Sequence, residues 1–212
     1  MVVTVAFGTF VGLYAGYHGG WVDTLLMRLT DAMMAIPAIL VALALAGLMD
    51  GKEIALPPDW MGGPWLSFKL QRGTVGLFIV IGLVSWTGIA RIVRSQVLAL
   101  KHCPFVDAAR ALGFSHRRVI WRHVFPNVLP RLLVLVALST AWAITVEAGV
   151  SYLGVGIPPP APSWGGMIGE GQPYLIVAPW SVVPAGLAIF VAVLGFNLLG
   201  QGLQNVLSPD SH

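Results

Sequence analysis

The stretch FVDAARALGFSHRRVIWRHVFPNVLP, residues 105–130, is the most cationic part of a chain that otherwise carries few charges. We call it the basic segment. Its basic residues are Arg110, His116, Arg117, Arg118, Arg122 and His123. Apolar runs of nearly membrane-spanning length flank it on both sides. A polar segment with helical patterning between two such runs predicts a surface element with a role of its own.

The first half of the basic segment has the signals of a short helix. Pro104 suits the first helical turn, where its missing N–H would have no partner. Asp107 falls in the same turn, where the helix dipole favours an anion. Gly113 suits the end of the helix. Apolar residues with helical spacing form one face: Phe105, Ala108, Ala109 and Leu112.

The second half predicts another helix after a glycine turn. Ser115 is a good N-cap residue, and we expect the helix to continue through about Val124. Pro126 and Pro130 are expected to close the unit before the next apolar run. The cations expected to face water or a partner are Arg117, Arg118 and Arg122. The basic segment is therefore predicted to be a helix, a turn and a helix at a membrane surface.

The composition places most of the chain in a membrane. Of its 212 residues, 57% are hydrophobic and only 10% are charged, with a mean hydropathy of +0.81. Soluble domains carry about 25% charged residues, so this chain has too few to cover a soluble surface. Cys103 is the single cysteine, which excludes an intrachain disulfide. The histidines are scattered without metal-ligand spacing, and we predict no metal site.

Apolar runs predict about five membrane spans, with the basic segment lying between the third and the fourth. They cover roughly residues 2–17, 32–49, 74–90, 132–148 and 179–203. The run at 2–17 is shorter than the ~20 residues that a span requires. We therefore expect it to be the lower part of a span, and expect at least one upstream span to be absent from this chain.

The distribution of lysine and arginine predicts the orientation, because cytoplasmic loops carry an excess of these residues. With the basic segment inside, the outer loops 50–73 and 149–178 hold only Lys52, Lys69 and Arg72. The remaining lysines and arginines lie inside: Arg28, Arg91, Arg94, Lys101, Arg110, Arg117, Arg118, Arg122 and Arg131.

From the residues alone, three interpretations of the basic segment stay open. A basic amphipathic helix beside a membrane can bind anionic lipid headgroups. A DNA-binding helix-turn-helix has a similar outline, although tethering between two spans argues against it, and we expect no nucleic-acid partner. The third interpretation is a docking site for a soluble protein.

The spacing within the basic segment resembles a known motif. Asp107-Ala108-Ala109, three residues, Gly113, nine residues and then His123-Val124-Phe125-Pro126 is similar to the cytoplasmic signature loop of ABC-importer permeases. That pattern reads Glu-Ala-Ala, three residues, Gly, nine residues, Ile, any residue, Leu, Pro. This chain departs from the pattern at three positions, Asp107, His123 and Phe125.

Further pieces resemble the dipeptide, oligopeptide and nickel branch of that family, in particular the second permease of the pair. They follow in order along nearly the whole chain, apart from the loop at 51–73. They are AGYHGGWVD at 15–23, Arg28 with Asp31, YLGVG at 152–156, PSWG at 162–165, APW at 178–180 and FNLLG at 196–200.

The resemblance implies an all-α fold, a polytopic transmembrane helical bundle with about five spans where the family has six. It would form a single transmembrane domain at 1–207, truncated at its N-terminus. It would also carry a cytoplasmic two-helix coupling loop at 96–130. The implied location is a bacterial-type inner (plasma) membrane, with the coupling loop and the C-terminus in the cytoplasm.

The resemblance also implies roles and partners. The chain would form half of a translocation pathway for peptides or a similar small solute. Its partners would be ATP-binding subunits, a homologous second permease, a periplasmic substrate-binding protein and the lipid bilayer. The residues implied in coupling to the ATP-binding subunit are Asp107, Ala108, Ala109, Gly113, Arg117, Arg118 and Pro126.

No residue is predicted to be catalytic, and we expect neither an enzyme nor a cofactor. The chain lacks a phosphate-binding glycine loop followed by Lys-Ser or Lys-Thr, so it is not predicted to bind ATP itself. Glu147, at the outer end of the fourth span, is a candidate for lining the pathway, because a carboxylate at membrane depth marks function by default. It can equally lie at the interface. Arg28 and Asp31 are predicted to form a local ion pair.

Two alternatives from other classes remain. One is a membrane scaffold or a non-functional truncated remnant, which the short first run suggests. The other is a secondary transporter. Ion coupling normally uses several intramembrane ionisable groups, and Glu147 is the only acidic candidate near a span interior.

Overall fold

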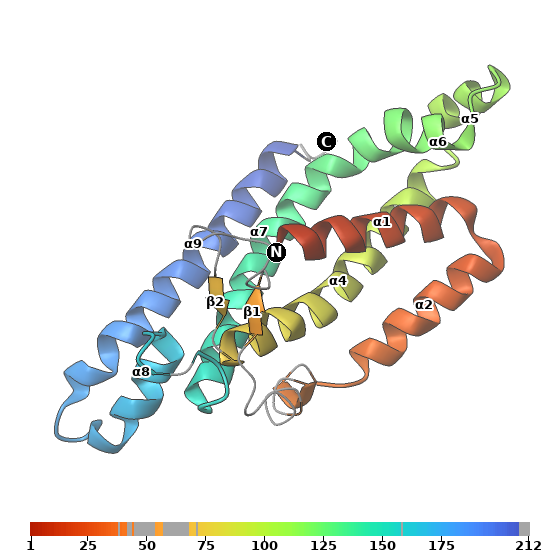
Figure 1. Cartoon of the computed structure of the whole chain (residues 1–212). Coiled ribbons are helices and arrows are strands. Elements are labelled where there is room, and N and C mark those ends of the chain that lie inside the picture. Colours follow the sequence, from red (N-terminus) through yellow and green to blue (C-terminus); the bar gives the residue numbers. More distant parts are fainter. Residues whose placement is uncertain are drawn as a thin grey trace. The chain divides into compact units, whose positions relative to one another are not determined.

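The computed structural model describes residues 1–37, 39–41, 44, 54–56, 68–70, 72–157 and 159–207. These residues are predominantly helical, in line with the all-α class (Figure 1). The chain divides into two compact units. The first contains Met1–Ile36, Gly82–Thr140 and the chain from Gly195 onward, and the second contains Pro37–Ile81 and Ala141–Leu194.

The first unit begins with two helices joined by a tight glycine turn. Helix α1 covers Val2–His18 and α2 covers Gly20–Met34. Gly19 and Gly20 between them have φ angles of 66° and 60°, a left-handed conformation that glycine adopts without steric cost. Helix α4, Arg72–Leu100, contributes residues 82–100 to the same unit.

Small residues on α1 allow it to lie directly against α4. A Cβ atom added to Gly12 would lie 2.5 Å from the carbonyl oxygen of Ala90 and 2.8 Å from Cβ of Val93. Gly8 and Gly16, one turn to either side, meet α4 in the same way. The two backbones therefore approach each other closely along two helical turns, as small-residue stripes permit in membrane helices.

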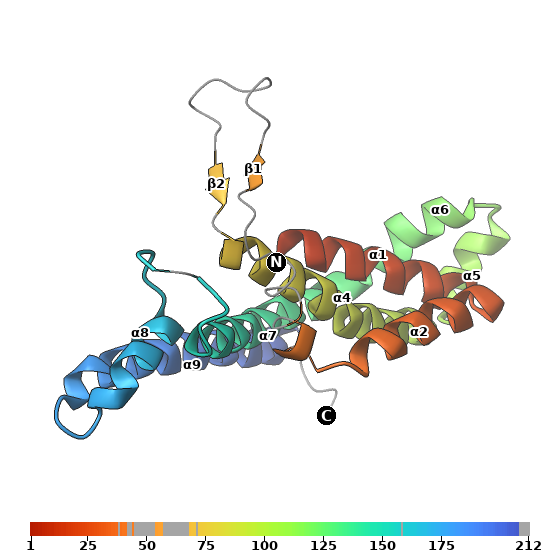
Figure 2. The same ribbon diagram turned by 60° about the horizontal axis from the view of Figure 1, so that its bottom comes forward.

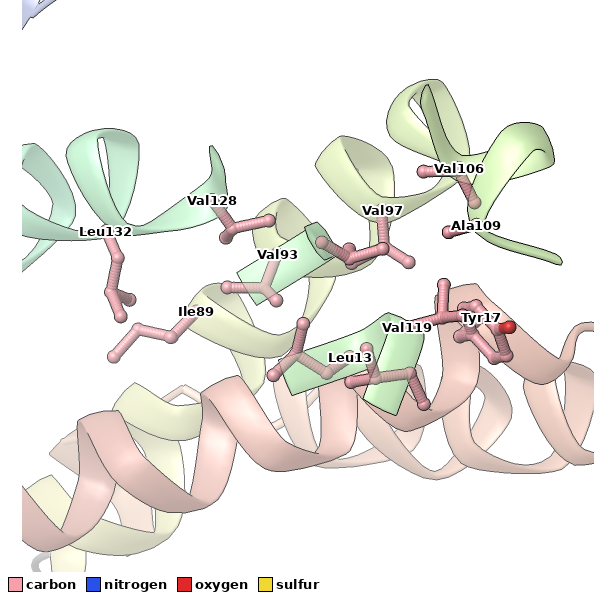
Figure 3. Packing of buried hydrophobic residues seen from close by; sticks show 12 residues of the cluster. Leu13, Tyr17, Ile89, Val93, Val97, Val106, Ala109, Val119, Val128 and Leu132 are labelled. Carbon is pink, nitrogen blue, oxygen red and sulfur yellow. The ribbon is translucent and has the colours of Figure 1, made fainter. Parts of the chain in front are cut away.

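A valine-rich core holds the first unit together (Figure 3). It joins α1, the second half of α4 and the chain that follows α4, and its most enclosed side chains are fully buried. These are Val93, Val97, Val106, Val119, Val124 and Val128. Since each side chain buried from water contributes about 1.5–3 kcal/mol, this cluster fixes the basic segment to α1 and α4.

The basic segment folds into a series of short helical pieces that lead into a long helix. They are α5, Pro104–Ala111; α6, His116–Val119; a π-helical turn η1, Ile120–Val124; and α7, Phe125–Tyr152. From His116 to Tyr152 the helical path is continuous.

That continuity corrects the prediction that Pro126 and Pro130 close the unit. Both prolines lie within the helical path. Proline removes one backbone N–H and its ring collides with the carbonyl four residues back. The π turn precedes Pro126, and in it the N–H of Phe125 donates to the carbonyl of Ile120, five residues back. This wider turn accommodates the proline without ending the helix.

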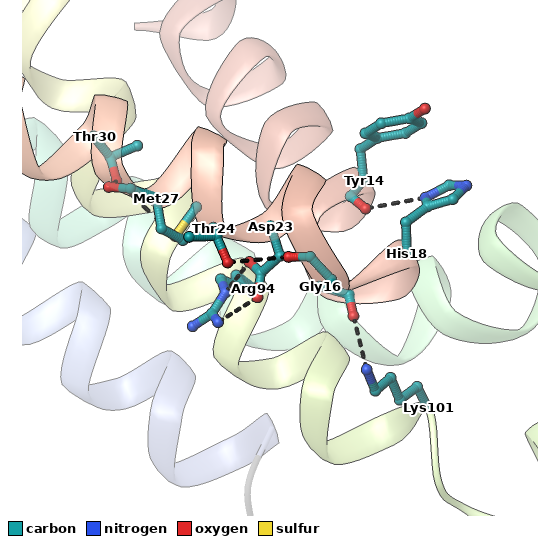
Figure 4. A network of polar contacts seen from close by, with 10 residues as sticks. Tyr14, Gly16, His18, Asp23, Thr24, Met27, Thr30, Arg94 and Lys101 are labelled. Atoms are coloured by element: carbon teal, nitrogen blue, oxygen red, sulfur yellow. Dashed lines mark hydrogen bonds and ion pairs between the residues drawn. The ribbon is translucent and has the colours of Figure 1, made fainter.

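Two ion pairs join α2 to α4. The guanidinium of Arg94 donates to both carboxylate oxygens of Asp23, which is mostly buried (Figure 4). These hydrogen bonds raise the pKa of Arg94 above its ordinary value. Asp31 accepts from Arg91 at 2.6 Å. The predicted local pair of Arg28 with Asp31 is therefore wrong, because the cation from the neighbouring helix reaches Asp31 instead.

The second unit contains shorter elements. Two strands, β1 at Ile54–Leu56 and β2 at Phe68–Leu70, run antiparallel with Ala55 opposite Lys69 (Figure 2). This small hairpin was not part of the predicted all-helical fold. Helix α8, Trp164–Gly171, follows the Gly/Pro-rich loop and is capped by the hydroxyl of Ser163, which accepts from the N–H of Gly166 at 3.0 Å.

Two 3₁₀ turns, η2 at Gln172–Tyr174 and η3 at Pro179–Ser181, lead into the last helix, α9, Val183–Leu207. Among the described residues, two helices are long and apolar enough to cross a membrane, His116–Tyr152 and Val183–Leu207. Within the span predicted at 32–49, residues 38, 42–43 and 45–49 lie outside the described residues. The number of about five spans therefore stays a prediction.

Candidate functional site

Helix α5 corresponds to the first helix predicted in the basic segment. Its two ends are set by a proline and a glycine. Pro104 is in the first turn, after an extended Cys103. At the other end Gly113 has a φ of +76°. The N–H of Gly113 donates to Arg110 at 2.9 Å and the N–H of Phe114 donates to Ala109 at 3.2 Å. This pair of bonds around a left-handed glycine is the Schellman closure.

The face of α5 that packs on the rest of the unit differs from the apolar face read from the sequence. Val106 is fully buried and Ala109 is almost so. Phe105 keeps 40% of its surface exposed and Leu112 keeps 73%. Ala108 is exposed as well. The sequence pattern therefore identified mainly an outward-facing apolar surface, and the inward face depends on Val106, which the pattern did not include.

The second helix begins where it was expected, but its predicted side-chain cap is not formed. Ser115 occupies the N-cap position with an extended backbone, and its carbonyl accepts from the N–H of Val119 at 3.0 Å. Its hydroxyl makes no capping hydrogen bond.

The basic side chains of the second helix surround a shallow depression. Arg118 lies over the ring of Phe114, with Cζ 4.2 Å from the ring centre, a favourable cation–π geometry. The depression is lined by Ser115, Arg117, Arg118, Trp121, Arg122 and Pro126. The structure thus brings three predicted coupling residues, Arg117, Arg118 and Pro126, to one surface. Asp107, Ala108, Ala109 and Gly113 belong to α5 and its closing turn.

Residues of α1, to which the sequence pattern assigned no role, support this site. The hydroxyl of Tyr17 shares a hydrogen bond with Nδ1 of His116, at 3.1 Å. The guanidinium of Arg110 lies 5.3 Å from the centre of the Tyr17 ring, and Arg110 also contacts Asp107 at 3.4 Å. Tyr17 lies within the AGYHGGWVD piece, so a signal was present in the sequence without indicating this contact.

The C-terminal end of α1 is also tied to the end of α4. Nζ of Lys101 donates to the carbonyl of Gly16 at 3.4 Å (Figure 4). A cation at a helix C-terminus is favoured by the helix dipole. This hydrogen bond joins the end of α4 to the end of α1. Nearby, Tyr17 joins the same end of α1 to α6.

His123 occupies the position where the permease motif has an isoleucine. Its ring stacks on Phe114 with centres 5.8 Å apart. Its Nε2 atom is buried and has no hydrogen-bond partner among the described residues. A buried polar atom without a partner costs stability, so the departure from the motif carries an energetic cost.

Glu147 belongs to the second unit. It is partly buried, and its carboxylate accepts from the hydroxyl of Ser151 at 2.7 Å. The same hydroxyl accepts from the N–H of Ile157 at 3.3 Å. Ser151 therefore joins the end of α7 to the loop that follows it, and Glu147 accepts from the hydroxyl that makes this link.

Residues 8–211 of the chain match the model of a protein family, the binding-protein-dependent transport system inner membrane component. The chain is 36% identical over 203 residues to a dipeptide transport system permease of Alkalihalophilus pseudofirmus, covering 96% of this chain and 60% of that protein.

Two further relatives carry similar names. A glutathione transport system permease of Pectobacterium atrosepticum is 32% identical, covering 99% of this chain and 62% of that protein. A putative peptide transport system permease of Brucella suis is 39% identical, covering 98% and 63%. The chain spans about three fifths of the length of these curated relatives. In agreement with the resemblance seen in its motifs, the chain belongs to the family of inner-membrane components of binding-protein-dependent transport systems.

Proposed function

We propose that the chain is a permease subunit of an ATP-driven importer and that it couples to an ATP-binding subunit through the basic segment. The observation that carries this proposal is the two-faced helix α5. One face, at Val106 and Ala109, is buried in the core of the first unit. The neighbouring face, at Phe105, Ala108 and Leu112, is exposed and apolar.

An exposed apolar face on a short, rigid helix is suited to insertion into a cleft of a partner. Burying a side chain such as Phe105 or Leu112 contributes about 1.5–3 kcal/mol. The arginines near α5 would add charge complementarity with acidic groups of the partner. Both ends of α5 are fixed, by Pro104 and by the turn at Gly113, so docking would order few additional residues.

The packing of the first unit supports transmission of motion from α5. Val106 shares one hydrophobic core with Val97 of α4 and Leu13 of α1. A partner that holds α5 would therefore move α1 and α4 with it. Rigid-body closure of ATP-binding subunits would then act on two alternative packings of the spans, inward-open and outward-open. The chemistry of hydrolysis would belong to the partner.

The membrane arrangement is part of the same proposal. About five spans would form one transmembrane domain at 1–207, with the coupling loop 96–130 and the C-terminus in the cytoplasm. Loops 50–73 and 149–178 would lie outside and receive a periplasmic substrate-binding protein. A second, homologous permease would complete the pathway. The family assignment and the lysine and arginine distribution support this arrangement.

The proposed solute is a peptide or a similar small molecule. Support comes from the relatives, whose names specify dipeptides, glutathione and peptides. Glu147 remains the candidate for the pathway. Its bond to Ser151 occupies one carboxylate oxygen, and the second oxygen could accept from a solute.

The docking surface is tested by changing Leu112 to Glu in the chain co-expressed with its ATP-binding subunit and its second permease. Leu112 is 73% exposed, so the change leaves the fold intact. We expect a loss of affinity of at least about tenfold, because the contribution of one buried leucine is lost. Co-purification of the ATP-binding subunit and solute-stimulated ATP hydrolysis are the measurements.

Gln204→Glu provides the matched control, because Gln204 is exposed on α9 in the same unit. This variant should retain the ATP-binding subunit. Undiminished co-purification of Leu112→Glu would show that α5 is not the docking helix. A membrane scaffold, the alternative class, would retain the subunit in the unchanged chain and yet give no solute uptake in proteoliposomes.

A further inference from the structure

A cavity of about 520 Å³ lies between α1 on one side and α6 and η1 on the other. All its lining residues belong to the first unit. The body of the cavity is apolar and is formed by Phe10 and Leu13 of α1 and by Ile120 and Trp121 of η1. It is distinct from the shallow depression lined by Ser115, Arg118 and Arg122, although Trp121 and Arg117 border both.

One end of the cavity is basic. His18, His116 and Arg117 lie there. Nδ1 of His18 donates to the carbonyl of Tyr14 at 3.1 Å (Figure 4). The other ring nitrogen, Nε2, is left to contact a ligand. Nδ1 of His116 is likewise engaged by Tyr17. Both imidazole rings are held in place by bonds at one nitrogen, and Arg117 adds a permanent positive charge.

An exposed apolar strip on α1 leads into the cavity. Phe7, Phe10 and Tyr14 have helical spacing and keep between 43% and 56% of their surface exposed. The rings of Phe10 and Tyr14 are stacked, with centres 6.2 Å apart, and those of Tyr14 and His18 are 4.2 Å apart. The strip therefore runs along α1 from apolar side chains to the basic end of the cavity.

We propose that this cavity binds one anionic phospholipid, with its phosphate at His18, His116 and Arg117 and one acyl chain against Phe10 and Trp121. A long apolar surface that ends in cations is complementary to such a lipid at the edge of a bilayer: the apolar part matches the acyl chain, and the cations match the phosphate. A soluble anion would use only the basic end. The proposal rests on the membrane location of α1, which the family assignment supports, and not on docking of an ATP-binding subunit.

The bound lipid would touch both α1 and η1, which α1 contacts across the core of the first unit. It would therefore act as a link between the membrane and the support of the basic segment. We expect the thermal stability of the assembled protein to rise with the fraction of anionic lipid, because a ligand that binds only the folded state stabilises it.

The test uses the assembled transporter in nanodiscs made with lipids brominated on their acyl chains, which quench nearby tryptophan fluorescence. Phosphatidylglycerol is the anionic probe and phosphatidylcholine the neutral one. We expect stronger quenching by brominated phosphatidylglycerol. The excess should disappear in Trp121→Phe, which identifies Trp121 as the reporter among the eight tryptophans.

Charge variants test the headgroup site. Arg117→Gln should weaken the preference for phosphatidylglycerol by about fivefold, the loss expected for one arginine beside an anionic lipid. His18→Gln should weaken the preference in the same direction. Arg122→Gln is the matched control, since Arg122 is an exposed cation of the same turn that does not line the cavity, and its preference should be unchanged.

Three outcomes would overturn the proposal. The first is equal quenching of Trp121 by the two lipids. The second is an equal effect of Arg117→Gln and Arg122→Gln, which would indicate only general surface charge. The third is protection of Trp121 from both lipids in the assembled transporter, together with strong quenching in the isolated chain. That result would identify the cavity as an interface with another subunit.

Discussion

At the scale of single residues, His123 shows how a departure from a motif is tolerated. The permease pattern has isoleucine where this chain has histidine, and the partly buried ring lies beside Phe114. Stacking on Phe114 retains part of the packing that an aliphatic side chain would provide. The buried Nε2 atom, without a partner among the described residues, is the cost.

We predict that His123→Leu stabilises the protein. The change removes a buried polar atom and introduces an apolar side chain of similar size, so the free energy of unfolding should rise by about 1–3 kcal/mol. Thermal unfolding in detergent, followed by the loss of folded protein, measures the effect. His102→Leu is the control, because His102 is exposed. An unchanged or lowered midpoint for His123→Leu would indicate that Nε2 has a partner in the membrane-bound protein.

At the scale of elements, the contact between α1 and α4 depends on glycines of α1. The backbone carbonyl of Ala90 lies where a side chain at position 12 would begin. Backbone atoms cannot yield as the end of a flexible side chain can. The helices would have to separate, and the core that supports α5 would loosen with them.

We predict that Gly12→Leu destabilises the first unit by about 1–3 kcal/mol or more, the usual cost of overpacking. It should also reduce docking of the ATP-binding subunit, because α5 packs on the same core. Hydrogen exchange of peptides from 104–113 and co-purification are the two measurements. Gly202→Leu is the control, since a Cβ there has nothing within 4 Å. Equal protection in the two variants would show that α1 does not support α5.

At the scale of the whole molecule, the orientation in the membrane can be measured with the chain's own cysteine. Cys103 is the only cysteine and lies immediately before α5. It is partly exposed. In the proposed orientation its thiol faces the cytoplasm. A single native reporter therefore distinguishes the two orientations without other changes to the protein.

We predict that a membrane-impermeant maleimide labels Cys103 in inside-out vesicles and leaves it unlabelled in intact cells. The complementary variant is Ile176→Cys in a Cys103→Ser background. Ile176 is almost fully exposed and lies in the predicted outer loop. That cysteine should react in intact cells after the outer membrane is made permeable. The reverse pattern would place the basic segment outside and exclude coupling to a cytoplasmic ATP-binding subunit.

Local chemistry explains what could be predicted from the sequence. Pro104 and Gly113 mark the two ends of α5 because helix capping depends on a few neighbouring residues. The motif around Asp107, with the pieces along the chain, predicted the family that the comparison shows. The continuity of the helix past Pro126 was missed, because the π turn that accommodates the proline has no signal in single residues.

The sequence by itself was enough to predict a membrane protein, its family and the approximate bounds of α5. Only the tertiary structure decided which face of α5 is buried, that Tyr17 supports His116, and that Asp31 pairs with Arg91. The physical reason is the range of the interactions. Capping and helical periodicity act over a few residues, whereas the choice of a buried face or an ion-pair partner depends on helices that are distant in the chain and adjacent in space.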